Sequence, residues 1–82
     1  MELDLEEVTV KKGSYLEGKT LMEAEIPRKT DLIVLAIRKF GDKNPIFNPP
    51  TDYIFQIGDV LIILGKEEQV DNLRHLGDEI TA

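Results

Sequence analysis

Two short apolar runs dominate the hydrophobic pattern of the chain, Leu32–Ile37 and Val60–Leu64. Both are rich in β-branched residues and too short to span a membrane, which favours buried strands over helices. A strand with one buried face alternates apolar and polar residues, whereas these runs are apolar at every position. We therefore expect both faces of the sheet to be covered, by short helices on one side and by a second copy of the chain or a further domain on the other.

Three weaker patterns predict the remaining strands. Leu5–Val10 alternates loosely and predicts a first strand, while the apolar run that begins at Leu32 extends into a strand over Leu32–Lys39. Pro45–Phe47 predicts a short edge segment, because proline cannot donate a hydrogen bond to a neighbouring strand. Tyr53–Ile57 predicts a further short extended piece before the strongest strand.

Helical signals occur twice. The segment Thr20–Glu23 fits a capping box, and the short helix that it starts is expected to end at Pro27, because the residue before proline avoids helical backbone angles. Arg28–Asp31 is then interpreted as a polar turn. Glu67–Leu76 has acids in its first turn and an apolar stripe, which predicts a second helix, with Gly77 as its C-cap.

The order of these elements predicts an α+β fold with a small mixed or antiparallel sheet and two short helices. We expect residues 1–82 to form a single domain with a core over about 6–77. A chain of 82 residues buries only roughly 60–65% of its unfolded surface. Its core is therefore marginal, and we expect it to dimerise.

Charge and composition narrow the function classes. The chain has 16 acidic and 10 basic residues and a net charge of −6, which disfavours non-specific binding to nucleic acid. It has no cysteine, so neither disulfides nor thiolate chemistry is expected. The acidic segment Met1–Glu7 lacks the apolar core of a signal peptide. These features predict a cytoplasmic domain.

Candidate catalytic residues are sparse. His75, the single histidine, is predicted to lie at a helix end, and Ser14 has no neighbouring base. Gly13–Thr20 matches the phosphate-loop pattern GxxxxGK[ST] letter for letter. A phosphate loop follows a buried apolar strand and opens a long helix, whereas this segment follows polar residues and its helix is expected to end at Pro27. We interpret the match as accidental and expect no enzymatic activity.

Acidic pairs offer oxygen ligands of the kind that hard cations take. None of them has the spacing of a calcium-binding loop, and we predict no metal site. The alternative interpretation of each pair is a solvated acidic surface. The pairs and clusters are Asp4 with Glu6 and Glu7, Glu67 with Glu68, and Asp78 with Glu79.

Three segments together resemble the TrkA C-terminal domain, also known as the C-terminal lobe of the RCK module that regulates potassium conductance. They are Val8–Leu21, Ile33–Arg38 and Gly58–Leu73. The most specific parts are the loop with the pattern Gly-Ser-x-Leu-x-Gly-Lys-Thr-Leu and the strand with the pattern Gly-Asp-Val-Leu-x-x-x-Gly. The resemblance covers nearly the whole chain.

This resemblance implies a regulatory, ligand-sensing domain that forms a homodimer and acts on a potassium channel or transporter in the membrane. In such proteins the domain typically follows a Rossmann-like nucleotide-binding lobe. Some members bind cyclic di-AMP at the dimer interface, and others respond to divalent cations. A small regulatory ligand is therefore implied, and no resident cofactor.

The resemblance places the ligand site around the segment that enters the second strand. Arg28 and Arg38 are the candidates to donate bidentate hydrogen bonds to a phosphate or carboxylate. Solvated charge is the alternative for both. Two other functions stay open: a dimerisation module without a ligand, and a divalent-cation sensor. The predicted ligand-binding residues are Ile26, Arg28, Ile33, Val34, Arg38 and Phe40.

Overall fold

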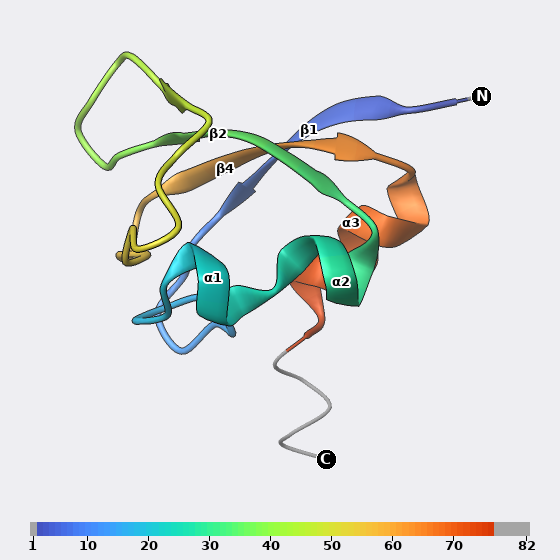
Figure 1. Ribbon diagram of the computed structural model, residues 1–82, viewed down its shortest axis with the longest axis horizontal. Helices are drawn as coiled ribbons and strands as arrows, with labels where there is room; N and C mark the ends of the chain where they lie inside the picture. Colours follow the sequence, from blue (N-terminus) through green and yellow to red (C-terminus); the bar gives the residue numbers. More distant parts are fainter. Residues whose placement is uncertain (1, 77–82) are drawn as a thin grey trace.

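A four-stranded antiparallel sheet forms one layer of the computed structural model, which describes residues 2–76 (Figure 1). The strand order is β1-β4-β2-β3, so that β4 and β2 are central and the other two strands form the edges. The predicted α+β class and antiparallel sheet are confirmed. The strands are β1 (Asp4–Thr9), β2 (Ile33–Arg38), β3 (Ile46–Phe47) and β4 (Val60–Gly65).

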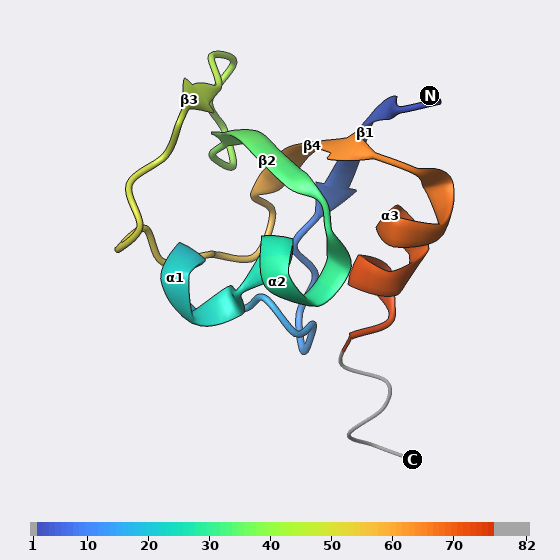
Figure 2. The same cartoon turned by 45° about the vertical axis from the view of Figure 1, so that its right-hand side comes forward.

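Three helices lie on one side of this sheet, as Figures 1 and 2 both show. They are α1 (Leu21–Ala24), α2 (Ile26–Thr30) and α3 (Glu67–Arg74). The C-terminal helix was predicted at the correct place. The predicted C-cap Gly77, which also ends the predicted core, lies outside the described residues.

The covered face of the sheet carries the core. Leu61 and Ile63 of β4 point to this face, and Val8 of β1 and Ile37 of β2 each lie opposite Leu61 in the strand register. All four are buried. Because side chains at alternating positions share a face, the register of the two strand pairs brings these residues into one apolar layer against the helices. Phe55, Ile26 and Val70 pack into the same cluster.

The opposite face, which we call the open face, is also apolar. Leu5, Leu64 and Ile33 form one row across β1, β4 and β2, and Phe47 belongs to the next row with Ile62. Leu5, Ile33 and Phe47 are 64%, 54% and 70% exposed. None of the helices described over residues 2–76 packs on this face. The apolar character expected on both faces is confirmed, while the expected cover by a second copy stays a prediction.

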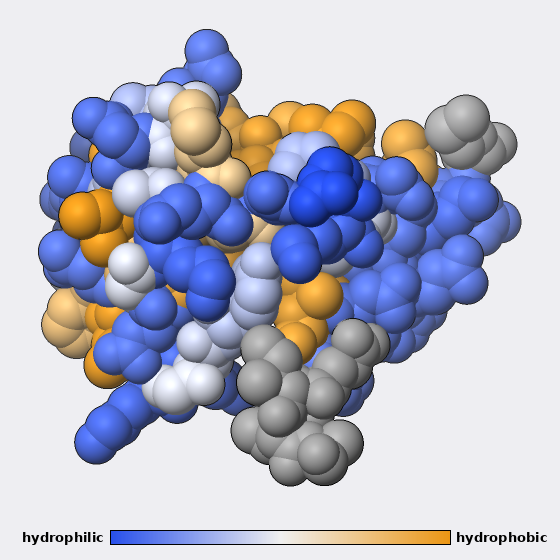
Figure 3. All heavy atoms as spheres, turned by 60° about the horizontal axis from the view of Figure 1, so that its bottom comes forward, coloured by the Kyte–Doolittle hydropathy of each residue, from blue (hydrophilic) through white to orange (hydrophobic). Residues whose placement is uncertain are grey.

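The helical side of the molecule has a different surface. Figure 3 looks at this side and shows a mainly hydrophilic surface with separate apolar patches. Charged side chains over the helices thus separate the core from solvent. The contrast with the open face is a consequence of which residues alternate along the strands.

The prediction that Pro27 ends a single helix was wrong. Pro27 lies in the first turn of α2, where its missing N–H group has no helical partner to lose. The break falls at Glu25 instead, which adopts the left-handed conformation with a φ of 49°. The predicted polar turn over residues 28–31 is therefore mostly the second half of α2.

The predicted capping box at the start of α1 is confirmed. The Thr20 hydroxyl accepts from the Glu23 N–H at 3.0 Å, and the Thr20 N–H donates to the Glu23 carboxylate at 2.9 Å. The hydrogen bond from the Thr20 N–H to the carboxylate is the main reason why the pKa of Glu23 is lowered. The first predicted strand and the short edge segment are confirmed as β1 and β3. The piece predicted over 53–57 contributes only a single bridge, between Ile54 and Thr20.

Candidate functional site

An apolar hollow of about 440 Å³ lies where α1 and α2 meet the start of β2, and we call it the β2 hollow. Its size is in the range of small-ligand sites. Glu25 is the one charged residue among the described residues that line it. Apolar side chains from the helices, from β2 and from the loop after β3 form most of its wall: Leu21, Met22, Pro27, Leu32, Ile33, Val34 and Pro49.

The corner between α1 and α2 holds Glu25 at the edge of this hollow. The Glu25 N–H donates to the Met22 carbonyl at 3.3 Å, and the Glu25 carbonyl accepts from the Lys29 N–H at 3.0 Å. Its backbone is thus tied to both helices. This anchoring fixes the left-handed turn and hence the direction of the carboxylate.

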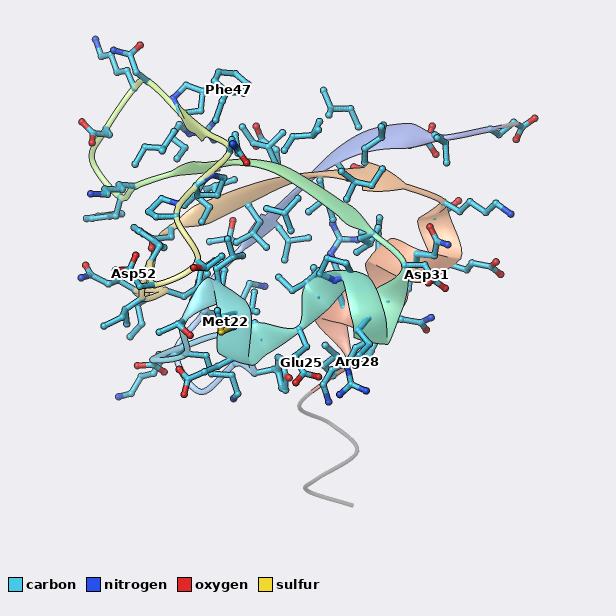
Figure 4. The ribbon with its side chains drawn as sticks, in the orientation of Figure 1. Met22, Glu25, Arg28, Asp31, Phe47 and Asp52 are labelled. Atoms are coloured by element: carbon cyan, nitrogen blue, oxygen red, sulfur yellow. The ribbon has the colours of Figure 1, made fainter. Side chains whose placement is uncertain are left out.

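Arg28 is paired with this carboxylate. Its Nε donates to Oε2 of Glu25 at 2.7 Å, and its Nη2 contacts the same oxygen. Figure 4 shows the two side chains together at the foot of the α1–α2 corner. The pair is exposed to solvent on the Arg28 side, where the side chain is 76% accessible. Arg28 does not itself line the β2 hollow, but its guanidinium is next to the hollow through its partner Glu25, which does.

The predicted site residues fall into two groups. Ile33 and Val34 line the β2 hollow, whereas Arg28 does not line it but pairs with the lining residue Glu25. Ile26 is fully buried in the core, where it supports the corner from beneath.

Arg38 and Phe40 lie at the other end of β2. The six-residue strand Ile33–Arg38 spans roughly 17 Å at the usual rise per residue. Arg38 pairs with Glu7 at 3.2 Å across the open face, and Phe40 is 79% exposed. The structure thus does not bring these two residues together with Arg28, Ile33 and Val34.

Sequence reasoning missed Met22, Glu25 and Pro49 as lining residues. Met22 and Glu25 were assigned to a single continuous helix. Pro27 was an available signal, because proline is favoured in the first turn of a helix. If Pro27 is interpreted as the first turn of a new helix, the break between the two helices falls at Glu25, and the chain forms a corner there.

Asp59 is a buried carboxylate that organises the far end of the sheet. It accepts hydrogen bonds from the Phe40 N–H at 3.2 Å, the Gln56 N–H at 2.9 Å and the Tyr53 hydroxyl at 2.5 Å. Asp59 is only 1% exposed, so these three donors replace water around it. Burial first, and then the bond to Asp59, raises the pKa of Tyr53 far above its ordinary value.

Two further searches concern metals and membranes. Over residues 2–76, no three side chains of the His, Cys, Asp and Glu types lie close enough to hold a metal ion. The helices described in this range are all too short or too polar to cross a bilayer.

A second hollow, of about 370 Å³, lies along the outer edge of β1 beside the end of α3. Lys11, Ser14 and Arg74 are among its lining residues. Arg74 reaches the backbone carbonyl of Glu7 at 3.3 Å, so its guanidinium already covers part of this strand edge. That contact reduces the space in which a ligand could meet the edge.

Comparison with known proteins gives a consistent result. The model of the TrkA-C domain family matches residues 5–76. Potassium channel protein 1 of Methanocaldococcus jannaschii is 38% identical over 63 residues, which are 77% of this chain and 18% of that protein. The K(+)/H(+) antiporter subunit KhtT of Bacillus subtilis is 31% identical over 74 residues, 90% of this chain and 44% of that protein. The chain spans less than half the length of these relatives.

Solved structures share the fold. The RCK_C domain dimer of Streptococcus agalactiae BusR in complex with c-di-AMP superposes with a TM-score of 0.77 at 21% identity, covering 92% of this chain and 96% of that one. The RCK C domain of the potassium transport protein KtrA, also in complex with c-di-AMP, gives a TM-score of 0.79 at 21% identity, covering 92% and 84%. At this level of identity the likeness concerns the fold.

Proposed function

The chain belongs to the TrkA-C domain family, and we propose that it is the ligand-sensing regulatory domain of a potassium channel or transporter. The family resemblance seen in the sequence is thereby confirmed. The relatives that support the proposal are a potassium channel protein and a subunit of a potassium–proton antiporter. We further propose that residues 1–82 form one regulatory unit without enzymatic activity. This unit would lie on the cytoplasmic side, in contact with a membrane channel or transporter and with a Rossmann-like lobe.

One observation carries the sensing role: Ile33 belongs both to the β2 hollow and to the open face. It lines the hollow, and it also stands in the exposed apolar row with Leu64 and Leu5. A second copy of the chain that covers the open face would therefore change the wall of the hollow. Ligand binding and association of two chains are coupled in this arrangement, because each alters the surroundings of the same side chain.

Association as a homodimer follows from the open face. Burying apolar side chains stabilises a complex by roughly 25 cal/mol per Å² removed from water, before the cost of association is subtracted. Leu5, Ile33 and Phe47 together offer a continuous set of such side chains on three strands. The BusR neighbour, whose fold this chain shares, is a dimer of the same type of domain.

Cyclic di-AMP is the ligand that we propose for the β2 hollow. Its adenine rings suit the apolar wall formed by Met22, Val34 and Pro49, and its phosphates suit the guanidinium of Arg28 next to the hollow. Two neighbours of the same fold were solved in complex with this molecule. With a net charge of −6, nucleic acid is not a proposed partner.

Regulation then works through two states. A ligand shifts an equilibrium only by the difference between its affinities for the two states. In our proposal the ligand binds the dimer with a closed hollow more tightly than the separate chains. The resulting change in the pose of two lobes is transmitted to the channel or transporter.

Thermal unfolding and sedimentation of the purified chain with cyclic di-AMP test this function. We expect a higher Tm and a shift toward dimer, and a loss of roughly tenfold in affinity for Arg28→Gln, because a hydrogen bond to a charged group contributes about 1.5–3 kcal/mol. Lys29→Gln removes a neighbouring charge outside the hollow and serves as the matched control. A chain that neither dimerises nor responds to the ligand contradicts the proposal.

A further inference from the structure

We propose that Glu25 is an intramolecular competitor of the anionic ligand, which occupies Arg28 until a phosphate group replaces it. This inference rests on the proposed function, since it concerns the same hollow. It assigns to Glu25 the control of how strongly the hollow prefers charged over uncharged ligands. Four observations support it.

The first observation is the pairing itself. Two nitrogen atoms of Arg28, Nε and Nη2, contact one carboxylate oxygen of Glu25. These are among the donors that a guanidinium uses for a phosphate oxygen. A phosphate that binds Arg28 in this way must therefore take the place of the carboxylate.

The second observation is that Glu25 borders the space proposed for the ligand. Glu25 lines the β2 hollow together with Met22 and Pro27. Its negative charge would repel a phosphate that enters while Glu25 stays near Arg28. An uncharged ligand meets no such repulsion.

The third observation concerns the backbone of Glu25, which has a φ of 49°. This conformation is costly for most side chains and suits glycine or asparagine better. A glutamate here is not required for the fold of the corner, since its side chain forms no capping hydrogen bond with α2. The described contacts of the carboxylate are those with Arg28.

The fourth observation is that the pair is accessible. The side chains of Arg28 and Glu25 are 76% and 40% exposed. Exposed ion pairs are weak, so a ligand phosphate can displace the carboxylate at a small cost. The competition tunes the affinity of the hollow rather than closing it.

The test compares cyclic di-AMP and adenosine as probes by isothermal titration calorimetry at low ionic strength. We expect Glu25→Gln to bind cyclic di-AMP about three- to tenfold more tightly than the wild-type chain, while adenosine binds no more tightly. Glu68→Gln removes one negative charge from an exposed position of α3 and should leave both affinities unchanged. In an Arg28→Gln background the gain from Glu25→Gln should disappear, because the competition needs the guanidinium.

Several outcomes overturn this inference. Equal affinity of Glu25→Gln and wild type for cyclic di-AMP removes it while leaving the proposed function intact. An equal gain for adenosine, or a gain that persists with Arg28→Gln, assigns the effect to shape or general charge. If neither the wild type nor Glu25→Gln binds cyclic di-AMP, the proposed ligand and the inference fail together. Glu25→Asn, whose side chain suits the backbone angle, repeats the test with the corner preserved.

Discussion

The two faces of the sheet contain similar residues in different surroundings. Leu61 and Ile63 on the covered face are fully buried, whereas Leu5 and Ile33 on the open face are 64% and 54% exposed. All four belong to the same sheet, and the alternation of side chains along each strand decides which face each one occupies. The covered face has the helices packed against it, while the open face has none of the helices described over residues 2–76.

The two faces therefore have different roles: the covered face stabilises the fold, and in our proposal the open face serves the function of the chain. The covered face supplies the apolar burial that an 82-residue chain needs to be stable. The open face adds no comparable burial in a single chain, yet it retains leucine, isoleucine and phenylalanine. In our proposal these apolar residues serve association, and Ile33 connects that association to the β2 hollow.

The largest expected effect contrasts the two faces directly. Ile63→Ala removes a fully buried side chain that lies opposite Val34 in the strand register, and should lower the free energy of unfolding by about 2–5 kcal/mol. The corresponding change on the open face, Ile33→Ala, should cost less than about 1 kcal/mol in the single chain, because the side chain already meets water. Urea unfolding at low protein concentration measures both.

Equal losses for the two variants would contradict the comparison. At high protein concentration we expect Ile33→Ala to weaken dimerisation directly. Ile63→Ala should lower the dimer population only because it unfolds the chain. Sedimentation over a range of concentrations separates these cases.

A second expected effect concerns polar groups on the buried side. Asp59→Ala leaves the Phe40 N–H, the Gln56 N–H and the Tyr53 hydroxyl without their common acceptor. We expect a loss of about 3 kcal/mol, because buried donors without partners retain their desolvation cost. Thermal unfolding should show a Tm lower by roughly 12–24 °C at that loss. The exposed Asp52 provides the control: Asp52→Ala should leave Tm nearly unchanged.

Much of this fold could be predicted from the sequence because its signals are local. The apolar runs, the Thr20–Glu23 capping box and the apolar stripe of α3 each depend on neighbours within a few residues. The family resemblance used the same segments. The strand order β1-β4-β2-β3 is not given by such local signals, because β1 and β4 are neighbours in the sheet although they lie at opposite ends of the chain.

The corner at Glu25 could not be predicted in the same way. A proline is compatible both with the end of a helix and with the first turn of the next, and only packing of Ile26 into the core decides between them. The candidate site depends on this corner, since it places Glu25 and Arg28 beside β2. Arg38 and Phe40 were grouped with Arg28 because they are near it in sequence, but the length of β2 places them at the opposite end of that strand.

A third prediction uses alkaline pH. The pKa of Tyr53 is raised in the folded chain, mainly by burial, and is close to 10 when the chain is unfolded. Its stabilising contribution is therefore complete below about pH 10 and declines as pH rises above that value. Tyr53→Phe should cost about 1.5 kcal/mol at neutral pH, since it removes a bond to the Asp59 carboxylate. Between pH 10 and 11.5 the stability difference between wild type and Tyr53→Phe should shrink; a constant difference would argue against this linkage.

The smallest expected effect tests whether the open face stays open. Arg38 and Glu7 form an ion pair across it, with side chains 31% and 57% exposed. In a single chain, a double-mutant cycle with Arg38→Ala and Glu7→Ala should give a coupling energy of about 0.2–1 kcal/mol that declines with added salt, as for other exposed pairs.

Cover by a second copy changes this expectation, because a pair removed from water interacts more strongly and is screened less by salt. The coupling energy should therefore rise with protein concentration as dimers form, and its dependence on salt should weaken. A coupling energy that is the same for single chains and dimers places the interface away from the Arg38–Glu7 pair. The interface would then be confined to the row of Leu5, Leu64 and Ile33, which is the part of the open face that continues into the β2 hollow.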